Sequence, residues 1–573
     1  MGHEAHHHEE KQNLSFFASP LAHHPSAPAY ETGAHADLEH QQKSHHNASV
    51  STDPSASNPE FENMDSSIHD NPAFHRHAEA TTAELFYDLF FVANLTTFTS
   101  MLEINDRHSL TAYIGFFSLL WLTWYQVSLY DVRFSADSVF ERVAKAIHFG
   151  VMVGFAVIGP QWKPGQDMPD YKIYKAFGLM LMVSRLTLFC QYGVTLLWTK
   201  KYKKTIVPLV MVMAWTLLAA VLYGALTPTF PKTLLDIEGD EIPQKSNVYI
   251  AWYVIAISET ILTVTVSCVW RIISFKGTHM VQRMSLLTLI ILGEGIIVIC
   301  KSISKIVKNE YLWTVSVVGQ IVSGTYTSIH FLPNTTTTNI PPPAVCTIYF
   351  LYMLYFDRLT SDHFGSIKQQ VWSFLHFPLH VVLVLVLQGV SLLIIWRQAV
   401  ENMNGLETDW LPPLDFIESN FTSYDPATIF GQTMATVNET YSNGTAYADY
   451  FNYTCFVNVY NYIPKGVDAS KELKTVAQAY LDIQEGMDNY LPDFGNETAA
   501  QQLWNGINSM TSATYKTLFD TFSVTVAKRK MKKSDVPDLQ VTEHQYYQIF
   551  DLILSYTFIA VSLLNCSRYD GFC

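Results

Sequence analysis

The amino-acid sequence predicts an all-α membrane protein, a polytopic bundle of about ten transmembrane helices. Only 15% of its 573 residues are charged and 49% are hydrophobic, whereas about 25% of residues are charged in soluble proteins. The hydrophobic residues are grouped in stretches of about 20, the length at which an α-helix crosses a bilayer. Acidic residues gather instead in two polar regions, 1–80 and 397–540, which account for the formal net charge of −15.

The first element, residues 1–80, is predicted to be a disordered, cytoplasmic N-terminal tail. It holds most of the 21 histidines, with His6 to His8 contiguous, and it is rich in Ser, Pro and Asn without apolar periodicity. No apolar core near Met1 resembles a cleaved signal peptide. We therefore expect the first hydrophobic segment to remain as a transmembrane helix.

The membrane bundle is predicted over residues 81–396, followed by a final helix and short tail at 541–573. Stretches long enough to span lie near 84–103, 109–131, 142–160, 173–198, 205–227, 249–274, 283–304, 371–396 and 545–566. Between the seventh and eighth, the runs Trp313–Gly324 and Ala344–Phe356 are each too short to span. We interpret the polar, proline-rich segment 325–343 as an insertion within one span, either a re-entrant excursion or translated non-coding sequence.

Charge and glycosylation motifs together set the predicted orientation. Four lysines between 200 and 204 belong on the cytoplasmic side by the positive-inside rule. With nine spans before it, region 397–540 then lies outside the cytoplasm, in the plasma membrane or an endomembrane. Five Asn-x-Thr sequons agree with an external, glycosylated position: Asn420, Asn438, Asn443, Asn452 and Asn496. The basic run 528–533 disagrees, but the rule is weak for long loops.

The external region is predicted to contain a small, partly helical cap. Apolar residues recur at helical spacing within 465–527. They include Leu473, Val476, Ala479, Tyr480 and Ile483. This pattern predicts amphipathic helices that pack on one another outside the membrane.

Charged residues inside apolar spans are the candidate functional residues. Each charge at mid-bilayer costs about 3 kcal/mol on insertion scales, so such residues are expected to have a role. On the predicted orientation, one set lines an inner vestibule: Glu84, Asp88, Arg133, Arg283, Asp357, His376 and His380. Arg185, Glu259 and Glu294 lie deeper in the membrane.

Glu294 is predicted to be the central switch, with Arg185 as its counter-charge. Gly293 and Gly295 flank it and let a neighbouring helix approach. A buried carboxylate without a cation can exchange a proton, whereas one paired with Arg185 is a gate or a structural clamp. Buried ion pairs also join helices without any transport role, and that alternative stays open. His376 and His380 share a helical face around Pro378, which suits a proton or metal site.

Several function classes lack their sequence motifs. The chain has no P-loop, Rossmann glycine pattern, HExxH or G-x-S-x-G, so we expect no catalytic residue and no cofactor. Basic residues are few and scattered, which argues against nucleic-acid binding. The seven cysteines show neither zinc-ligand spacing nor a disulfide pattern.

Four motifs resemble those of the low temperature requirement protein A (LtrA) family of multi-pass membrane proteins. Residues 84–92 read ELFYDLFFV, similar to the family's ELFFDLVFV, and residues 283–295 read RMSLLTLIILGEG, similar to its Arg followed by GLFTIIALGES. MLYFD ending at Asp357 and FLHFPL containing His376 match two later family motifs. Gly295 replaces the Ser that often follows the LGE motif, and the external region is longer than in bacterial members. The resemblance implies an architecture, and an uninterrupted helix ending at MLYFD, but no substrate.

The leading functional interpretation is a secondary transporter or channel-like pathway for protons, ions or a small charged solute. The alternative is a membrane sensor or scaffold, related to stress or cold, whose buried charges are structural. A third hypothesis is a membrane-embedded enzyme with a metal site at His376 and His380. The lipid bilayer is the one predicted partner, and assembly into a homo-oligomer stays open.

Overall fold

A computed structural model describes most of the chain. The described residues are 15–21, 74, 79–101, 104–234, 242–274, 278–307, 344–357, 366–422, 444–464, 470–490, 492–493, 495–522, 524 and 539–566. The apolar run Trp313–Gly324 and the insertion 325–343 lie outside the described residues, as do sequon residues Asn438 and Asn443.

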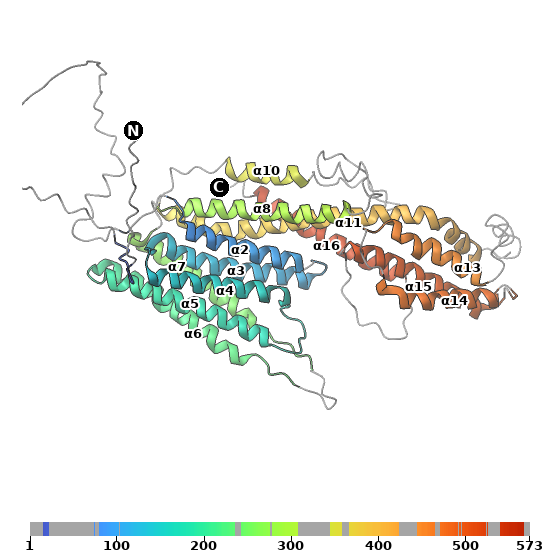
Figure 1. Ribbon diagram of the computed structural model, residues 1–573, viewed down its shortest axis with the longest axis horizontal. Coiled ribbons are helices and arrows are strands. Elements are labelled where there is room, and N and C mark those ends of the chain that lie inside the picture. The colour runs from blue at the N-terminus through green and yellow to red at the C-terminus, as the bar shows by residue number, and fades with distance from the viewer. Residues whose placement is uncertain are drawn as a thin grey trace, which may run out of the picture.

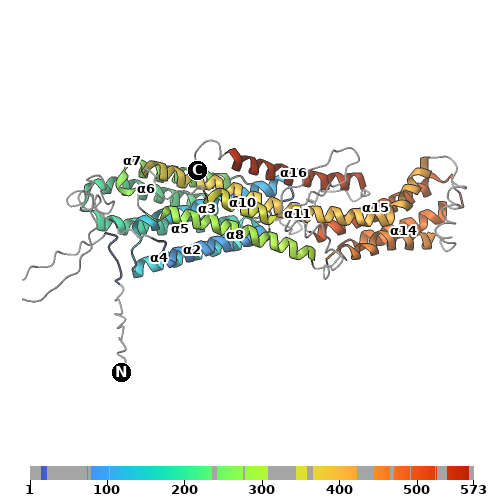
Figure 2. The same ribbon diagram turned by 90° about the horizontal axis from the view of Figure 1, so that it is seen from above.

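The described residues form an elongated, all-helical molecule (Figure 1). A bundle of long helices makes up one part, and a smaller helical cap makes up the other. Helices α11 and α16 run between them, as the perpendicular view also shows (Figure 2). The predicted all-α fold is therefore confirmed.

Each of the nine continuous stretches predicted to span coincides with a helix, whereas the tenth span, predicted from 313–324 and 344–356, is described only in its second half. The bundle helices are α2 (Thr82–Met101), α3 (Arg107–Phe134), α4 (Val139–Ile158), α5 (Lys172–Thr199), α6 (Lys203–Leu226), α7 (Tyr249–Val269), α8 (Met280–Val307), α10 (Ala344–Phe356), α11 (Ser366–Thr422) and α16 (Leu539–Cys566). Of the described helices, α4 to α8, α11 and α16 are long and apolar enough to cross a membrane. These helices make the protein an integral, multi-pass membrane protein.

Helix α3 is surrounded by other helices along its second half. Every residue from Leu119 to Phe134 is buried, because α2, α5, α7 and α11 pack around it. Protein rather than lipid surrounds its polar side chains, so they can find hydrogen-bond partners. At its start, Asp106 caps the helix by accepting a hydrogen bond from the Ser109 backbone N–H at 2.6 Å.

Helix α11 is the structural axis of the molecule. It has 57 residues and is about 85 Å long at 1.5 Å per residue, far more than the hydrocarbon thickness of about 30 Å. The sequence predicted a span ending at residue 396, yet the helix continues to Thr422. It packs on α3, α7, α8 and α16 in the bundle and on α15 in the cap.

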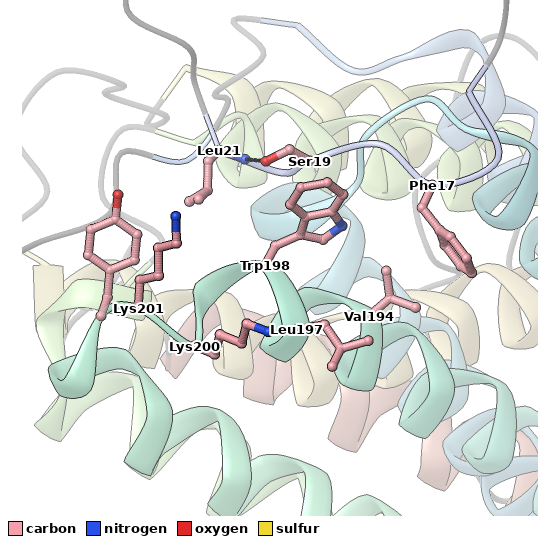
Figure 3. Close-up of a pocket in the computed structure, with 9 residues that line it drawn as sticks. Phe17, Ser19, Leu21, Val194, Leu197, Trp198, Lys200 and Lys201 are labelled. Atoms are coloured by element: carbon pink, nitrogen blue, oxygen red, sulfur yellow. Dashed lines mark hydrogen bonds between the residues drawn. The ribbon is translucent and has the colours of Figure 1, made fainter.

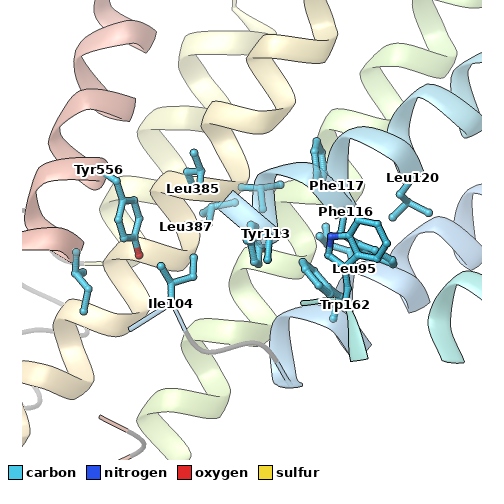
Figure 4. Close-up of a cluster of buried hydrophobic side chains, with 14 of the residues drawn as sticks. Leu95, Ile104, Tyr113, Phe116, Phe117, Leu120, Trp162, Leu385, Leu387 and Tyr556 are labelled. Carbon is cyan, nitrogen blue, oxygen red and sulfur yellow. The ribbon is translucent and has the colours of Figure 1, made fainter. Parts of the chain in front are cut away.

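Aromatic and aliphatic side chains fill the bundle interior. Phe98 of α2 stacks on Phe116 of α3 with ring centroids 4.4 Å apart, and Trp162 and Leu387 belong to the same buried cluster (Figure 4). A Cβ added at Gly295 would lie only 2.6 Å from a methyl group of Leu387. Gly295 thus allows α8 and α11 to approach closely, as the sequence predicted, whereas nothing lies within 4 Å of such an atom at Gly293.

The cap contains α13 (Gly444–Phe451), α14 (Leu473–Tyr490) and α15 (Glu497–Thr521). Helices α14 and α15 are the amphipathic pair predicted within 465–527, and they pack on each other. Val476, Ala479 and Ile483 are buried. Asn402 of α11 donates to the Tyr462 carbonyl at 2.8 Å, which attaches the cap to the long helix.

A short N-terminal segment, Ser15–Leu21, lies against the bundle. The backbone N–H groups of Val139 and Phe140 donate to the carbonyls of Ser15 and Phe16, both at 3.1 Å. These N–H groups belong to the first turn of α4, where a helix has no internal acceptors. The N-terminal segment therefore caps α4 from a region that the sequence predicted to be disordered.

Candidate functional site

Six titratable side chains meet at the end of the bundle where α2 begins. We call them the base cluster: Glu84, Asp88, Asp131, Lys145, His279 and Arg283. Four helices or their immediate flanks supply them, namely α2, α3, α4 and α8. None is more than 7% exposed, so each charge depends on its neighbours rather than on water.

Arg283 lies at the centre of the base cluster. Its Nη2 donates to Asp88 Oδ1 at 3.0 Å, and its Nη1 lies 3.5 Å from Asp131 Oδ2 and 3.6 Å from Glu84 Oε1. Its guanidinium also lies over the ring of Trp124, 5.4 Å from the centroid. One cation thus joins three carboxylates on two different helices.

The remaining members of the cluster complete the charge balance. His279 Nε2 lies 3.1 Å from Glu84 Oε2, and Lys145 forms an ion pair with Asp131. Three carboxylates therefore face two basic side chains, Lys145 and Arg283, and the imidazole of His279.

A second chain of polar contacts extends from the cluster along α4. Tyr130 donates its hydroxyl to Glu141 Oε1 at 2.7 Å, and Gln191 Nε2 donates to Glu141 Oε2 at 2.8 Å. His148 Nε2 lies 3.0 Å from Gln191 Oε1. Glu141 and His279 were not among the candidate residues predicted from the sequence. Glu141, Lys145 and His148 lie at positions i, i+4 and i+7 on one face of α4. This spacing is the sequence signal from which Glu141 could have been predicted.

Deeper in the bundle, Arg185 of α5 pairs with Glu259 of α7. The Arg185 Nε donates to Glu259 Oε2 at 2.7 Å, and both side chains are essentially inaccessible. The sequence had assigned Arg185 as the counter-charge of Glu294, and this pairing is wrong. Whether Glu259 or Glu294 faces Arg185 depends on how the helices pack, and a single sequence does not reveal that packing.

Glu294 has different surroundings from every other buried carboxylate described above. Its Oε2 accepts a hydrogen bond from the Thr96 hydroxyl of α2 at 2.5 Å. Among the described residues, its buried Oε1 has no hydrogen-bond partner and no cation forms an ion pair with the carboxylate. The side chain lies near the middle of α8, three turns beyond Arg283.

An apolar layer separates Glu294 from the base cluster. Leu287 and Ile291 lie between Arg283 and Glu294 on the same face of α8, and both are completely buried. The two polar regions on this helix are therefore not joined by a continuous row of polar side chains of α8.

His376 and His380 lie on α11 with their rings 5.4 Å apart. Trp121 Nε1 donates to His380 Nδ1 at 2.9 Å, and Thr288 Oγ1 lies 2.8 Å from Nε2. Because an indole N–H can only donate, the hydrogen of a neutral His380 is on Nε2. His376 Nδ1 lies 2.8 Å from the Trp372 carbonyl, so that nitrogen carries its hydrogen.

These contacts bear on the metal-site hypothesis. In the described part of the chain, no group of three or more His, Cys, Asp or Glu side chains could hold a metal ion. His380 also uses both ring nitrogens for hydrogen bonds to Trp121 and Thr288. Neither observation favours a metal centre at this histidine pair.

The seven residues predicted to line an inner vestibule fall into separate environments. Glu84, Asp88 and Arg283 join in the base cluster, and the two histidines form their own pair. Arg133 donates instead to the Leu129 carbonyl, Ser267 and Tyr192, at 2.6, 3.0 and 3.3 Å. Asp357, at the end of α10, is exposed. Six of the seven are thus buried in protein and do not face open water in this structure.

Comparisons with known proteins identify the family. No curated protein and no solved structure matches the chain. The family model of the bacterial low temperature requirement A protein (LtrA) matches residues 79–411. This region contains the whole base cluster, the Arg185–Glu259 pair and Glu294, whereas cap helices α13 to α15 and helix α16 lie beyond it. Because the match covers more than half of the 573 residues, the chain belongs to the LtrA family.

Proposed function

We propose that this protein is a secondary transporter or channel-like pathway for protons, other ions or a small charged solute, with Glu294 as the carboxylate that binds the transported species. The observation that carries the proposal is a combination found at Glu294: one buried oxygen has no hydrogen-bond partner, and no ion pair compensates the carboxylate among the described residues, whereas Asp88, Asp131 and Glu259 each have an ion pair. A buried carboxylate in a membrane helix is costly, and such residues typically mark ion or proton pathways. Glu294 has one hydrogen bond, from Thr96, and its free Oε1 is available to a proton or cation.

The arrangement of polar and apolar layers supports the same proposal. Leu287 and Ile291 separate Glu294 from the base cluster, and an apolar constriction can gate a pathway by excluding water. In a transport cycle, Glu294 would face the cap side in one state and the base cluster in another. Gly295 provides the close α8–α11 contact at which such a rearrangement would occur.

The test is flux through purified protein in proteoliposomes, measured with an internal pH dye and with ion-sensitive dyes. Wild type is compared with Glu294→Gln, which removes the charge but keeps an acceptor for Thr96. Glu485→Gln, an exposed carboxylate of α14 in the cap, makes the same chemical change outside the membrane bundle and is the control.

We expect flux in the wild type and in Glu485→Gln, and loss of flux in Glu294→Gln at an unchanged melting temperature. Equal flux in Glu294→Gln and wild type would overturn the role of Glu294. No flux of any ion tested in the wild type would argue against transport and favour the second candidate.

The second candidate is a membrane sensor or scaffold, and the base cluster favours it. Its charges pair with one another and join four helical elements, as expected of a structural clamp. The cap is attached to α11, which continues into the bundle without interruption. On this reading the cap binds a partner, and stoichiometric co-purification of one protein that is lost on removing residues 444–522 would support it.

A further inference from the structure

We propose a second site, a binding site for the headgroup of an anionic phospholipid, at the base of the bundle. A cavity of about 560 Å³ lies between the C-terminal end of α5 and the N-terminal segment Ser15–Leu21 (Figure 3). It is separate from the base cluster and from Glu294, since none of those residues lines it. The proposal does not depend on a transport function.

The cavity presents two positive charges without an internal partner. Lys200 and Lys201 both line it, and within the described residues neither forms an ion pair with a carboxylate. None of the described residues that line it is acidic. A phosphate group has the complementary charge, and lysine ammonium groups bind phosphate by charge-assisted hydrogen bonds.

The position of the cavity indicates a lipid rather than a soluble ligand. Helix α5 is one of the membrane-crossing helices, and it ends at Thr199, so Lys200 and Lys201 lie where the helix leaves the bilayer. Trp198 and Tyr202 line the cavity at the same level, and these two residue types are enriched at membrane interfaces. Basic pockets at the cytoplasmic ends of membrane helices bind anionic headgroups.

The apolar part of the lining provides a surface for acyl chains. Val194 and Leu197 lie on the last one and a half turns of α5, which ends at Thr199. Leu197 is 67% exposed, which is unfavourable in water but suits a residue that contacts lipid tails. A phospholipid can therefore place its phosphate between the lysines and its chains along this face.

The N-terminal segment forms the opposite wall. Phe17, Ser19 and Leu21 line the cavity (Figure 3), and the segment is held by the two backbone hydrogen bonds to α4. The ring of Phe17 also packs on Phe140, with centroids 5.4 Å apart. Because α4 fixes this wall independently of α5, the site is a built cavity rather than two lysines on an open surface.

The experiment measures binding of a fluorescent phosphatidylserine to the full-length protein in neutral detergent micelles by anisotropy. Unlabelled phosphatidylserine, phosphatidylcholine and glycerol phosphate serve as competitors. The test variant is the double substitution Lys200→Gln/Lys201→Gln. The control is Lys203→Gln/Lys204→Gln, which removes the same charge from exposed residues one turn away that do not line the cavity.

We expect Lys200→Gln/Lys201→Gln to weaken binding about 25-fold, since each lysine near an anionic headgroup contributes a factor of about five, while the control binds as the wild type does. Phosphatidylserine should compete, and phosphatidylcholine and glycerol phosphate should not. Equal weakening in both double variants would overturn the site in favour of a diffuse basic surface. Equal competition by glycerol phosphate would overturn the lipid in favour of a soluble phosphate, and equal competition by phosphatidylcholine would show that charge has no role.

Discussion

Asp88 and Glu294 are both buried carboxylates of neighbouring bundle helices, yet their surroundings are opposite. Asp88 accepts hydrogen bonds from Arg283 at 3.0 Å and from Trp124 at 2.7 Å. Glu294 accepts one, from the neutral hydroxyl of Thr96. The base cluster uses its charges to satisfy one another, so it holds helices together. Asp88 Oδ2 and Glu294 Oε1 are each buried without a hydrogen-bond partner among the described residues, but Asp88 also has the ion pair with Arg283. Glu294 has no ion pair within the described part of the chain, which is why we propose it as the carboxylate that binds a proton or cation.

The contrast predicts different costs of mutation. Removing one member of a buried, paired set leaves the other charges without compensation, which is strongly destabilising. Removing an unpaired carboxylate removes an existing desolvation cost instead. Stability and activity should therefore separate along α8, with stability most sensitive at Arg283 and activity most sensitive at Glu294.

The largest loss of stability is expected for Arg283→Met. The substitution leaves Glu84, Asp88 and Asp131 facing only Lys145 and His279, and should cost about 3–5 kcal/mol. We expect little monodisperse protein by size-exclusion chromatography in detergent. Arg271→Met is the control, because Arg271 is exposed between α7 and α8 and its replacement should leave the yield unchanged. A normal yield of Arg283→Met would show that the base cluster does not hold the helices.

The Arg185–Glu259 pair should show a comparable loss that a second substitution reverses. Arg185→Met alone leaves Glu259 buried and uncompensated, at a cost of about 3–5 kcal/mol. The double variant Arg185→Met/Glu259→Met replaces the pair with apolar side chains of similar volume and should return close to wild-type stability. Thermal unfolding of the three variants measures this. A double variant as unstable as the single one would mean that the pair has a role beyond mutual compensation.

Trp121→Phe should have a smaller effect. It keeps an aromatic ring but removes the N–H that donates to His380 Nδ1, and leaving a buried acceptor without its donor costs about 1–3 kcal/mol. The melting temperature in detergent measures this loss. Trp198→Phe, at a partly exposed position of α5, is the matched control and should melt like the wild type. No shift for Trp121→Phe would contradict the hydrogen bond as a source of stability.

The smallest change in stability is expected for Glu294→Leu. This substitution removes the Thr96 hydrogen bond and the buried carboxylate together, so the two effects oppose each other and the net change should stay within about 1 kcal/mol. The same thermal unfolding assay as for Arg283→Met measures it. A loss as large as that of Arg283→Met would remove the distinction between the two regions and make Glu294 a structural residue.

The sequence predicted the bundle well because its signal is local. Apolar stretches of about 20 residues located the helices, and the first-span motif at Glu84 and Asp88 located part of the base cluster. Pairing between helices was not predictable in this way. Arg185 of α5 forms its ion pair with Glu259 of α7 rather than with Glu294, and this choice of partner is a property of the assembled bundle. His279 precedes α8 and was overlooked for the same reason, since its partner Glu84 lies 195 residues away in the sequence.

The N-terminal segment was missed for a different reason. Ser15–Leu21 is a short apolar stretch inside a region of low-complexity composition, and composition averaged over 80 residues hides a seven-residue element. Its contacts are backbone hydrogen bonds to α4, which leave little trace in residue type. The residue at which α11 ends was not predicted, because hydropathy indicates where a helix leaves the lipid. The helix itself continues for 26 residues beyond residue 396.

The continuity of α11 also makes it a mechanical lever. The helix carries His380 within the bundle and Asn402 at the cap contact, which lie about 33 Å apart along its axis at 1.5 Å per residue. A continuous helix resists bending, so a tilt of the cap would turn the part of α11 inside the bundle by the same angle. Force applied to the cap would thus reach the Trp121–His380–Thr288 contacts as a rotation, without any diffusing messenger.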